Sequence, residues 1–135
     1  MSRLGTSLIP LGIVIEGVTG LGLIVVPAVV ARLLLGSDLP EIGAVTARVA
    51  GVALVALALG CWLARNGRGG FAALAALLAY NALIAVYLGW LGLEDVFVGP
   101  LLWPAIILHT VVTVLLAIAL RQSETGQPTA PRTSR

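Results

Sequence analysis

The stretch FAALAALLAYNALIAVYLGWLGL, residues 71–93, decides the fold of this chain. It carries no charged residue, and it reaches the roughly 20 residues that an apolar α-helix needs to cross a bilayer. Its most polar side chain is Asn81, near the middle of the run. We therefore predict a transmembrane helix here, with one polar group at the depth of the hydrocarbon core.

Three further apolar runs lie on either side of this stretch. They cover about residues 8–35, 42–64 and 98–120. Short polar breaks separate the four runs, and loops this short make consecutive helices antiparallel and adjacent. The sequence therefore predicts an all-α fold, a transmembrane antiparallel four-helix bundle.

The bundle is expected to occupy residues 1–121 as one domain. Residues 122–135 are rich in Thr, Ser and Pro and have no apolar periodicity, so we expect a disordered cytoplasmic tail there. Pro27 and Pro104 fall inside two of the apolar runs, where each is expected to kink its helix or to start it.

Composition points to lipid as the solvent. Of the 135 residues, 59% are hydrophobic and 10% are charged, against typical values of roughly 45–50% and 25% in soluble domains. The net charge of +2 is too small to suggest a nucleic-acid partner. The single cysteine, Cys61, can form neither an internal disulfide nor a CxxC redox pair, and we expect it to pack between helices.

Charge placement predicts the orientation. Four arginines fall at one end of the expected bundle, whereas the loops at the other end are acidic. The arginines are Arg3, Arg65, Arg68 and Arg121, and the acidic residues are Asp38, Glu41, Glu94 and Asp95. Because cytoplasmic loops carry the excess of basic residues, both termini are expected in the cytoplasm. The chain uses only Arg for its basic residues and is dominated by Ala, Leu, Val and Gly, a coding bias that suggests a bacterial inner membrane.

Small residues recur on common helix faces. Gly12 and Gly20 share a face of the first run, and Ala47 and Gly51 share a face of the second. Such faces let helix backbones approach closely in lipid, where no hydrophobic force drives helices together. We expect packing within the chain, with a dimerisation face as the alternative.

A layer of polar side chains marks the candidate site. At 1.5 Å per helical residue, Glu16, Asn81 and His109 lie roughly 12, 15 and 16 Å from the cytoplasmic edge, near the middle of a core about 30 Å thick. Ionisable groups at that depth are costly and are functional candidates. We predict that all three side chains point into the bundle, with at least one pair within hydrogen-bond reach.

Several roles for these residues stay open. Glu16 is either neutral, a paired structural anion, or a proton carrier or ligand contact, because burial disfavours the charged form. Arg48, at roughly 24 Å, either extends to the outer interface near Asp38 or Glu41 or pairs with Glu16. Tyr80 is a polar neighbour of the layer and a further ligand-binding or proton-relay candidate.

No motif assigns a catalytic residue, a metal or a cofactor. One Glu and one His on different helices, without a second His or Cys at ligand spacing, do not predict a metal site. The sequence also lacks a P-loop, GxGxxG and GxSxG.

Three groups of residues together resemble a known family. They are EGVTGLGL (16–23) running on to Pro27 and LLLG (33–36), ARVAGVAL (47–54), and YNAL (80–83) with LLWPA (101–105) and His109. The chain is similar, over about residues 8–120, to a family of uncharacterised small bacterial four-helix integral membrane proteins, and more loosely to the DoxX-like group. The resemblance implies the fold and a membrane location but no activity. DoxX-like proteins are linked to respiratory or thiol-redox systems, a link that the single Cys61 does not support.

For function, the sequence favours a small membrane accessory or interaction protein rather than an enzyme. Two alternatives stay open. One is binding or transport of a lipophilic or protonatable small molecule through Glu16, Asn81 and His109, and the other is a membrane enzyme acting on a lipid. Expected partners are the bilayer, such a small molecule, and a second copy or a larger membrane complex, but not nucleic acid. A closed core whose polar groups bond to each other would favour the accessory protein, and an open pocket at this layer would favour either alternative.

Overall fold

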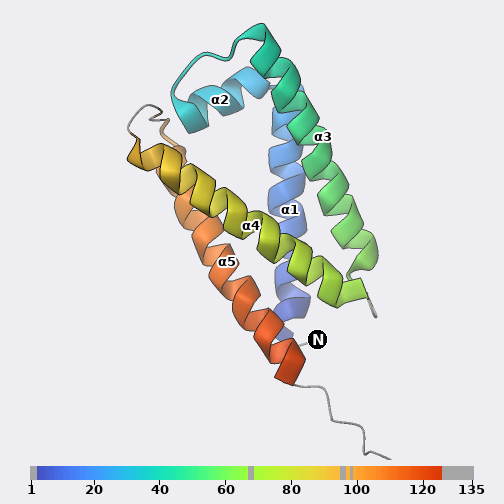
Figure 1. Cartoon of the computed structure of the whole chain (residues 1–135). Helices are drawn as coiled ribbons and strands as arrows, with labels where there is room; N and C mark the ends of the chain where they lie inside the picture. Colours follow the sequence, from blue (N-terminus) through green and yellow to red (C-terminus); the bar gives the residue numbers. More distant parts are fainter. Residues whose placement is uncertain (1–2, 67–68, 95–96, 98, 126–135) are drawn as a thin grey trace, which may run out of the picture.

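The computed structural model describes residues 3–66, 69–94, 97 and 99–125, and the regular structure within them is helical. The helices are α1 (Arg3–Val25), α2 (Pro27–Leu35), α3 (Glu41–Ala64), α4 (Gly70–Leu93) and α5 (Leu102–Thr125). Four of them are long and run alternately up and down, so the predicted all-α antiparallel four-helix bundle is confirmed (Figure 1). The two middle helices begin within one residue of their predicted starts.

The bundle is built from two closely packed helix pairs. The most extensive contacts are between α1 and α3 and between α4 and α5. In the first pair Gly20 meets Gly51, where an added Cβ would lie 2.8 Å and 2.6 Å, respectively, from the carbonyl oxygen of the other glycine. The prediction that small residues allow close packing within the chain is therefore confirmed at this crossing.

The first apolar run is not one helix, as the sequence analysis predicted, but two. It starts at Arg3, and it breaks at Val26, whose backbone angles of φ −131° and ψ 54° are not helical. The reason is Pro27, which follows directly: its ring disfavours the helical conformation of the preceding residue and it lacks a backbone N–H. Of the two expectations for Pro27, a kink or a helix start, the helix start is confirmed, because α2 begins at Pro27. The helix α2 turns away from the axis of α1 (Figure 1).

The short helix α2 is held in place by backbone contacts at its C-terminal end. Gly36 ends it in the left-handed conformation (φ 70°), and its N–H donates to the carbonyl of Arg32. The N–H of Leu101 donates to the carbonyl of Leu33 at 2.8 Å, and Gly99 packs directly against the backbone of Leu33 and Leu34. The start of α5 is therefore tied to α2.

The last helix also differs from its prediction. It begins at Leu102 rather than at about 98 and continues to Thr125, so the predicted tail boundary at residue 122 was wrong. Pro100 and the backbone approach of Gly99 to α2 delay its start, while Pro104 falls in the first turn, where a missing N–H costs nothing. A helix can also extend past its apolar stretch, because its hydrogen bonds are internal. Residues 126–135 of the predicted tail lie outside the described residues.

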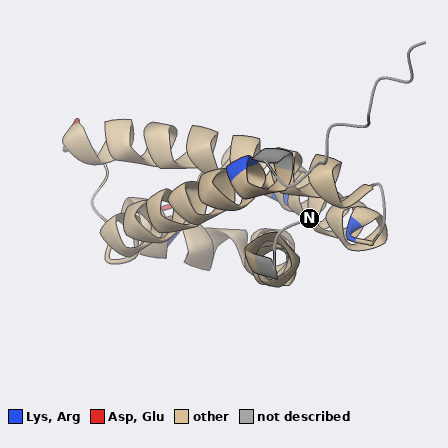
Figure 2. Cartoon of the chain, turned by 90° about the horizontal axis from the view of Figure 1, so that it is seen from below, with Lys and Arg blue, Asp and Glu red and all other residues tan. Residues whose placement is uncertain are grey.

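The outer surface of the bundle is apolar. The most exposed large hydrophobic side chains include Leu63, Leu83 and Val86, each more than 70% exposed, and few charges interrupt the ribbons (Figure 2). Each of the four long helices is long and apolar enough to cross a membrane. An apolar exterior on every long helix is unfavourable in water and suits lipid. These are the properties of a membrane protein.

Candidate functional site

Three polar side chains from three helices form one hydrogen-bonded chain in the middle of the bundle. Asn81 of α4 donates through Nδ2 to Oε1 of Glu16 on α1 at 3.0 Å and to the carbonyl oxygen of Leu77 at 2.9 Å. Its Oδ1 lies 2.8 Å from Nδ1 of His109 on α5. The prediction that these side chains face one another is confirmed, and both neighbouring pairs are within direct hydrogen-bond reach.

The three hydrogen-bonded side chains are buried. Glu16 and Asn81 have no exposed surface, and His109 is 8% exposed. Among the described residues, Oε2 of Glu16 has no hydrogen-bond partner. A charged carboxylate with one bare buried oxygen would be strongly unfavourable, so the geometry accommodates the neutral acid.

Tyr80 lies at the edge of this layer. Its ring packs edge-on against the imidazole of His109, with centroids 6.3 Å apart and planes at 76°, which is a preferred arrangement of two aromatic rings. Tyr80 therefore supports the imidazole from one side.

Arg48 does not belong to the hydrogen-bonded layer. Its side chain is exposed, and its Nε donates to the backbone carbonyl of Ile24 at 3.3 Å. That carbonyl lies in the last turn of α1, where the break at Val26 removes helical partners. An ion pair with Glu16 does not form, because Arg48 caps the end of α1 instead. Asp38 pairs with Arg32 at 2.5 Å, whereas the exposed Arg48 lines the same surface hollow as Glu41, in agreement with the alternative that it extends toward that end of the bundle.

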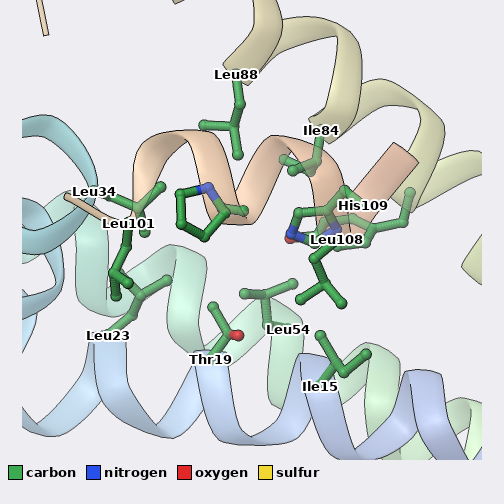
Figure 3. Close-up of a pocket in the computed structure, with 13 residues that line it drawn as sticks. Ile15, Thr19, Leu23, Leu34, Leu54, Ile84, Leu88, Leu101, Leu108 and His109 are labelled. Atoms are coloured by element: carbon green, nitrogen blue, oxygen red, sulfur yellow. The ribbon is translucent and has the colours of Figure 1, made fainter. Parts of the chain in front are cut away.

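A lateral pocket of about 410 Å³ opens beside the polar layer. Its lining is almost entirely aliphatic, with Thr19, Tyr80 and His109 as the polar side chains. In Figure 3, Ile84 and Leu88 of α4 lie on one side and Ile15 and Thr19 of α1 on the other, with His109 at one end. The volume is in the range of pockets that hold small molecules, which are mostly apolar with a few polar groups.

Sequence reasoning did not find this pocket. Its wall includes Leu34 of α2 and Leu101 from the turn before α5, two leucines that look like any other apolar residue of a span. They reach the pocket because α2 turns away from α1 and the Leu101–Leu33 backbone bond brings the two segments together. The only available signal was Pro27, which predicts a bend but not its direction.

Metal binding finds no support in the described part of the chain, where no three side chains of the His, Cys, Asp or Glu type gather closely enough to hold an ion. Cys61 is buried, and its thiol points to the carbonyl of Ala73 at 3.8 Å, so it serves packing between α3 and α4.

Comparison with known proteins identifies no relative of this chain. No protein-family model matches the chain, and neither a curated protein nor a solved structure is significantly similar to it. The role of the site therefore rests on its own geometry and chemistry.

Proposed function

We propose that this chain is an integral membrane protein that binds a lipophilic small molecule in the lateral pocket, with His109 at the polar end of that pocket. The observation that carries the proposal is the pocket of about 410 Å³ whose aliphatic wall ends on a buried, hydrogen-bonded imidazole. Burying a polar group inside a membrane costs free energy. A pocket that leads to such a group suggests that the group is kept because it binds a ligand.

The open cavity distinguishes this proposal from an accessory protein with a closed core. The polar groups do bond to each other, which on its own would fit a structural role. However, His109 and Tyr80 also line an open cavity, and a purely structural layer has no need of one. The combination favours ligand binding over the accessory role.

We also propose that both termini face the cytoplasm of a bacterial inner membrane. The ends of α3 and α5 near Arg65 and Arg121 lie at the same end of the bundle as the start of α1, and Asp38, Glu41 and Glu94 lie at the other (Figure 1). The excess of arginine at one end supports this orientation. The pocket then lies in the outer half of the bilayer.

Blocking the pocket tests ligand binding. Ile84→Trp fills the cavity from α4, whereas Leu83→Trp, the matched control, adds the same ring at the next residue, which is 72% exposed to lipid. Saturable binding of tritiated farnesol and of its methyl ether is measured on the protein purified in detergent micelles. We expect wild type and Leu83→Trp to bind at least one probe and Ile84→Trp to bind neither. Absence of saturable binding in the wild type, or equal binding by both variants, would contradict the proposed function.

A further inference from the structure

The side-chain amide of Asn81 has only one possible orientation. Both of its Nδ2 hydrogens are used, one by Oε1 of Glu16 and one by the carbonyl oxygen of Leu77. A backbone carbonyl can only accept a hydrogen bond. Rotating the amide by half a turn would place its oxygen, an acceptor, next to the carbonyl oxygen of Leu77, also an acceptor. Nδ2 must therefore face Leu77, and Oδ1 must face His109.

This orientation determines which ring nitrogen of His109 carries the proton. Oδ1 of Asn81 is a pure acceptor, and it lies 2.8 Å from Nδ1 of the imidazole. Nδ1 must therefore carry a hydrogen and donate it. A neutral imidazole has one N–H only, so Nε2 is left as a bare lone pair and a hydrogen-bond acceptor.

Nε2 is available to a ligand. Among the described residues, the hydrogen bond of the His109 ring runs through Nδ1. Nε2 does not belong to the buried polar atoms that lack a partner, which are Glu16 Oε2 and one nitrogen of Arg65. His109 lines the pocket and lies at one end of it (Figure 3). Because Nδ1 is engaged by Asn81, Nε2 is the ring nitrogen left for a molecule in that cavity.

A second apolar space adjoins the pocket at the end away from the imidazole. This space, of about 580 Å³, lies between α2, α3 and α4 and shares Leu23, Leu34, Ile84 and Leu88 with the first pocket. Its lining is aliphatic apart from Thr46 and Tyr87. A molecule whose polar end meets His109 therefore has room for a long apolar tail that points toward α2.

We propose that the ligand is a lipophilic alcohol or phenol whose hydroxyl donates to Nε2 of His109 and whose apolar tail extends into the space beneath α2. This proposal rests on the proposed function and names the ligand class. An ether, ester or ketone offers Nε2 only another acceptor, and a carboxylate would add an uncompensated charge in an apolar cavity.

The first test compares farnesol with farnesyl methyl ether, which differ in the hydroxyl hydrogen and one methyl group. We expect wild-type protein in micelles to bind the alcohol about tenfold more tightly, a ratio that corresponds to about 1.4 kcal/mol. His109→Leu should retain binding of the ether and lose the preference. If both probes bind the wild type equally, or the ether binds more tightly, the ligand class is wrong while the proposed function stands. If neither probe binds, the proposed function itself fails.

The second test needs no variant. The chain contains one histidine, so nitrogen-15 labelling of histidine gives a single imidazole in the NMR spectrum of the micellar protein. We expect a neutral ring with the proton on Nδ1, and a shift of the Nε2 resonance when farnesol, but not its methyl ether, is added. A ring protonated on Nε2 or on both nitrogens at neutral pH would overturn the proposed ligand class, and so would an Nε2 resonance that farnesol leaves unchanged.

Discussion

The crossing of α1 and α3 at Gly20 and Gly51 predicts a specific response to one added methyl group. In Gly51→Ala the new Cβ would lie 2.6 Å from the carbonyl oxygen of Gly20, 2.9 Å from Ile24 and 3.0 Å from Leu23. The nearest obstacle is backbone, which cannot rotate away as a side chain can. The two helices must therefore move apart. Leu23 of α1 and Leu54 of α3, which line the pocket, move with them.

Gly60 provides a matched control on the same helix. A Cβ added there meets nothing within 4 Å, so Gly60→Ala adds the same methyl group without strain. Both variants gain the same helix propensity, about 1 kcal/mol or less. The difference between them therefore isolates the cost of overpacking, for which about 1–3 kcal/mol is typical.

The measurement is the unfolding free energy of each variant in mixed micelles, titrated with a denaturing detergent and followed by far-UV circular dichroism. We expect Gly51→Ala to be about 1–3 kcal/mol less stable than Gly60→Ala. Equal stability of the two variants would refute the close backbone contact between α1 and α3 and the helix arrangement derived from it.

Three further predictions concern the polar layer, the topology and the tail. Glu16→Gln keeps an acceptor for Asn81 and should change the free energy of unfolding by less than about 1 kcal/mol. Glu16→Leu leaves an amide hydrogen of Asn81 unpaired and should lower that free energy by about 1–3 kcal/mol in the same assay. If Gln retains the fold but abolishes binding of farnesol, Glu16 acts as more than a hydrogen-bond partner. In a background without the native cysteine, a single cysteine at Leu39 should react with an impermeant reagent on intact cells and one at Ser123 should not; the reverse would refute the orientation. Deletion of residues 126–135 should leave membrane insertion unchanged, as measured by fractionation, and loss from the membrane fraction would contradict this.

The polar layer was predictable because depth in a bilayer follows directly from position in a helix. With a fixed rise per residue, Glu16, Asn81 and His109 had to lie at similar depth once the spans were known. The cost of exposing such groups to lipid then required them to face inward. Their burial and mutual hydrogen bonds confirm that reasoning.

Arg48 illustrates what the same reasoning left undecided. Its depth suggested either an interfacial charge or a partner of Glu16, yet its hydrogen-bond partner is the backbone carbonyl of Ile24. That carbonyl became available only because the helix breaks at Val26 and α1 and α3 approach closely. The spacing of residues in the sequence does not show which backbone carbonyls lose their hydrogen-bond partners where a helix breaks.

Membrane spans are determined by sequence alone, because the free energy of moving a helix from water into lipid is summed over neighbouring residues. The same holds for the bend at Pro27, which is a local steric effect. The pocket is different, since it is the space left between helices whose separation depends on contacts such as Gly20 with Gly51 and Leu101 with Leu33. Those residues are distant in the chain, and only the tertiary structure decides how their helices meet and therefore that His109 opens into a cavity rather than a closed core.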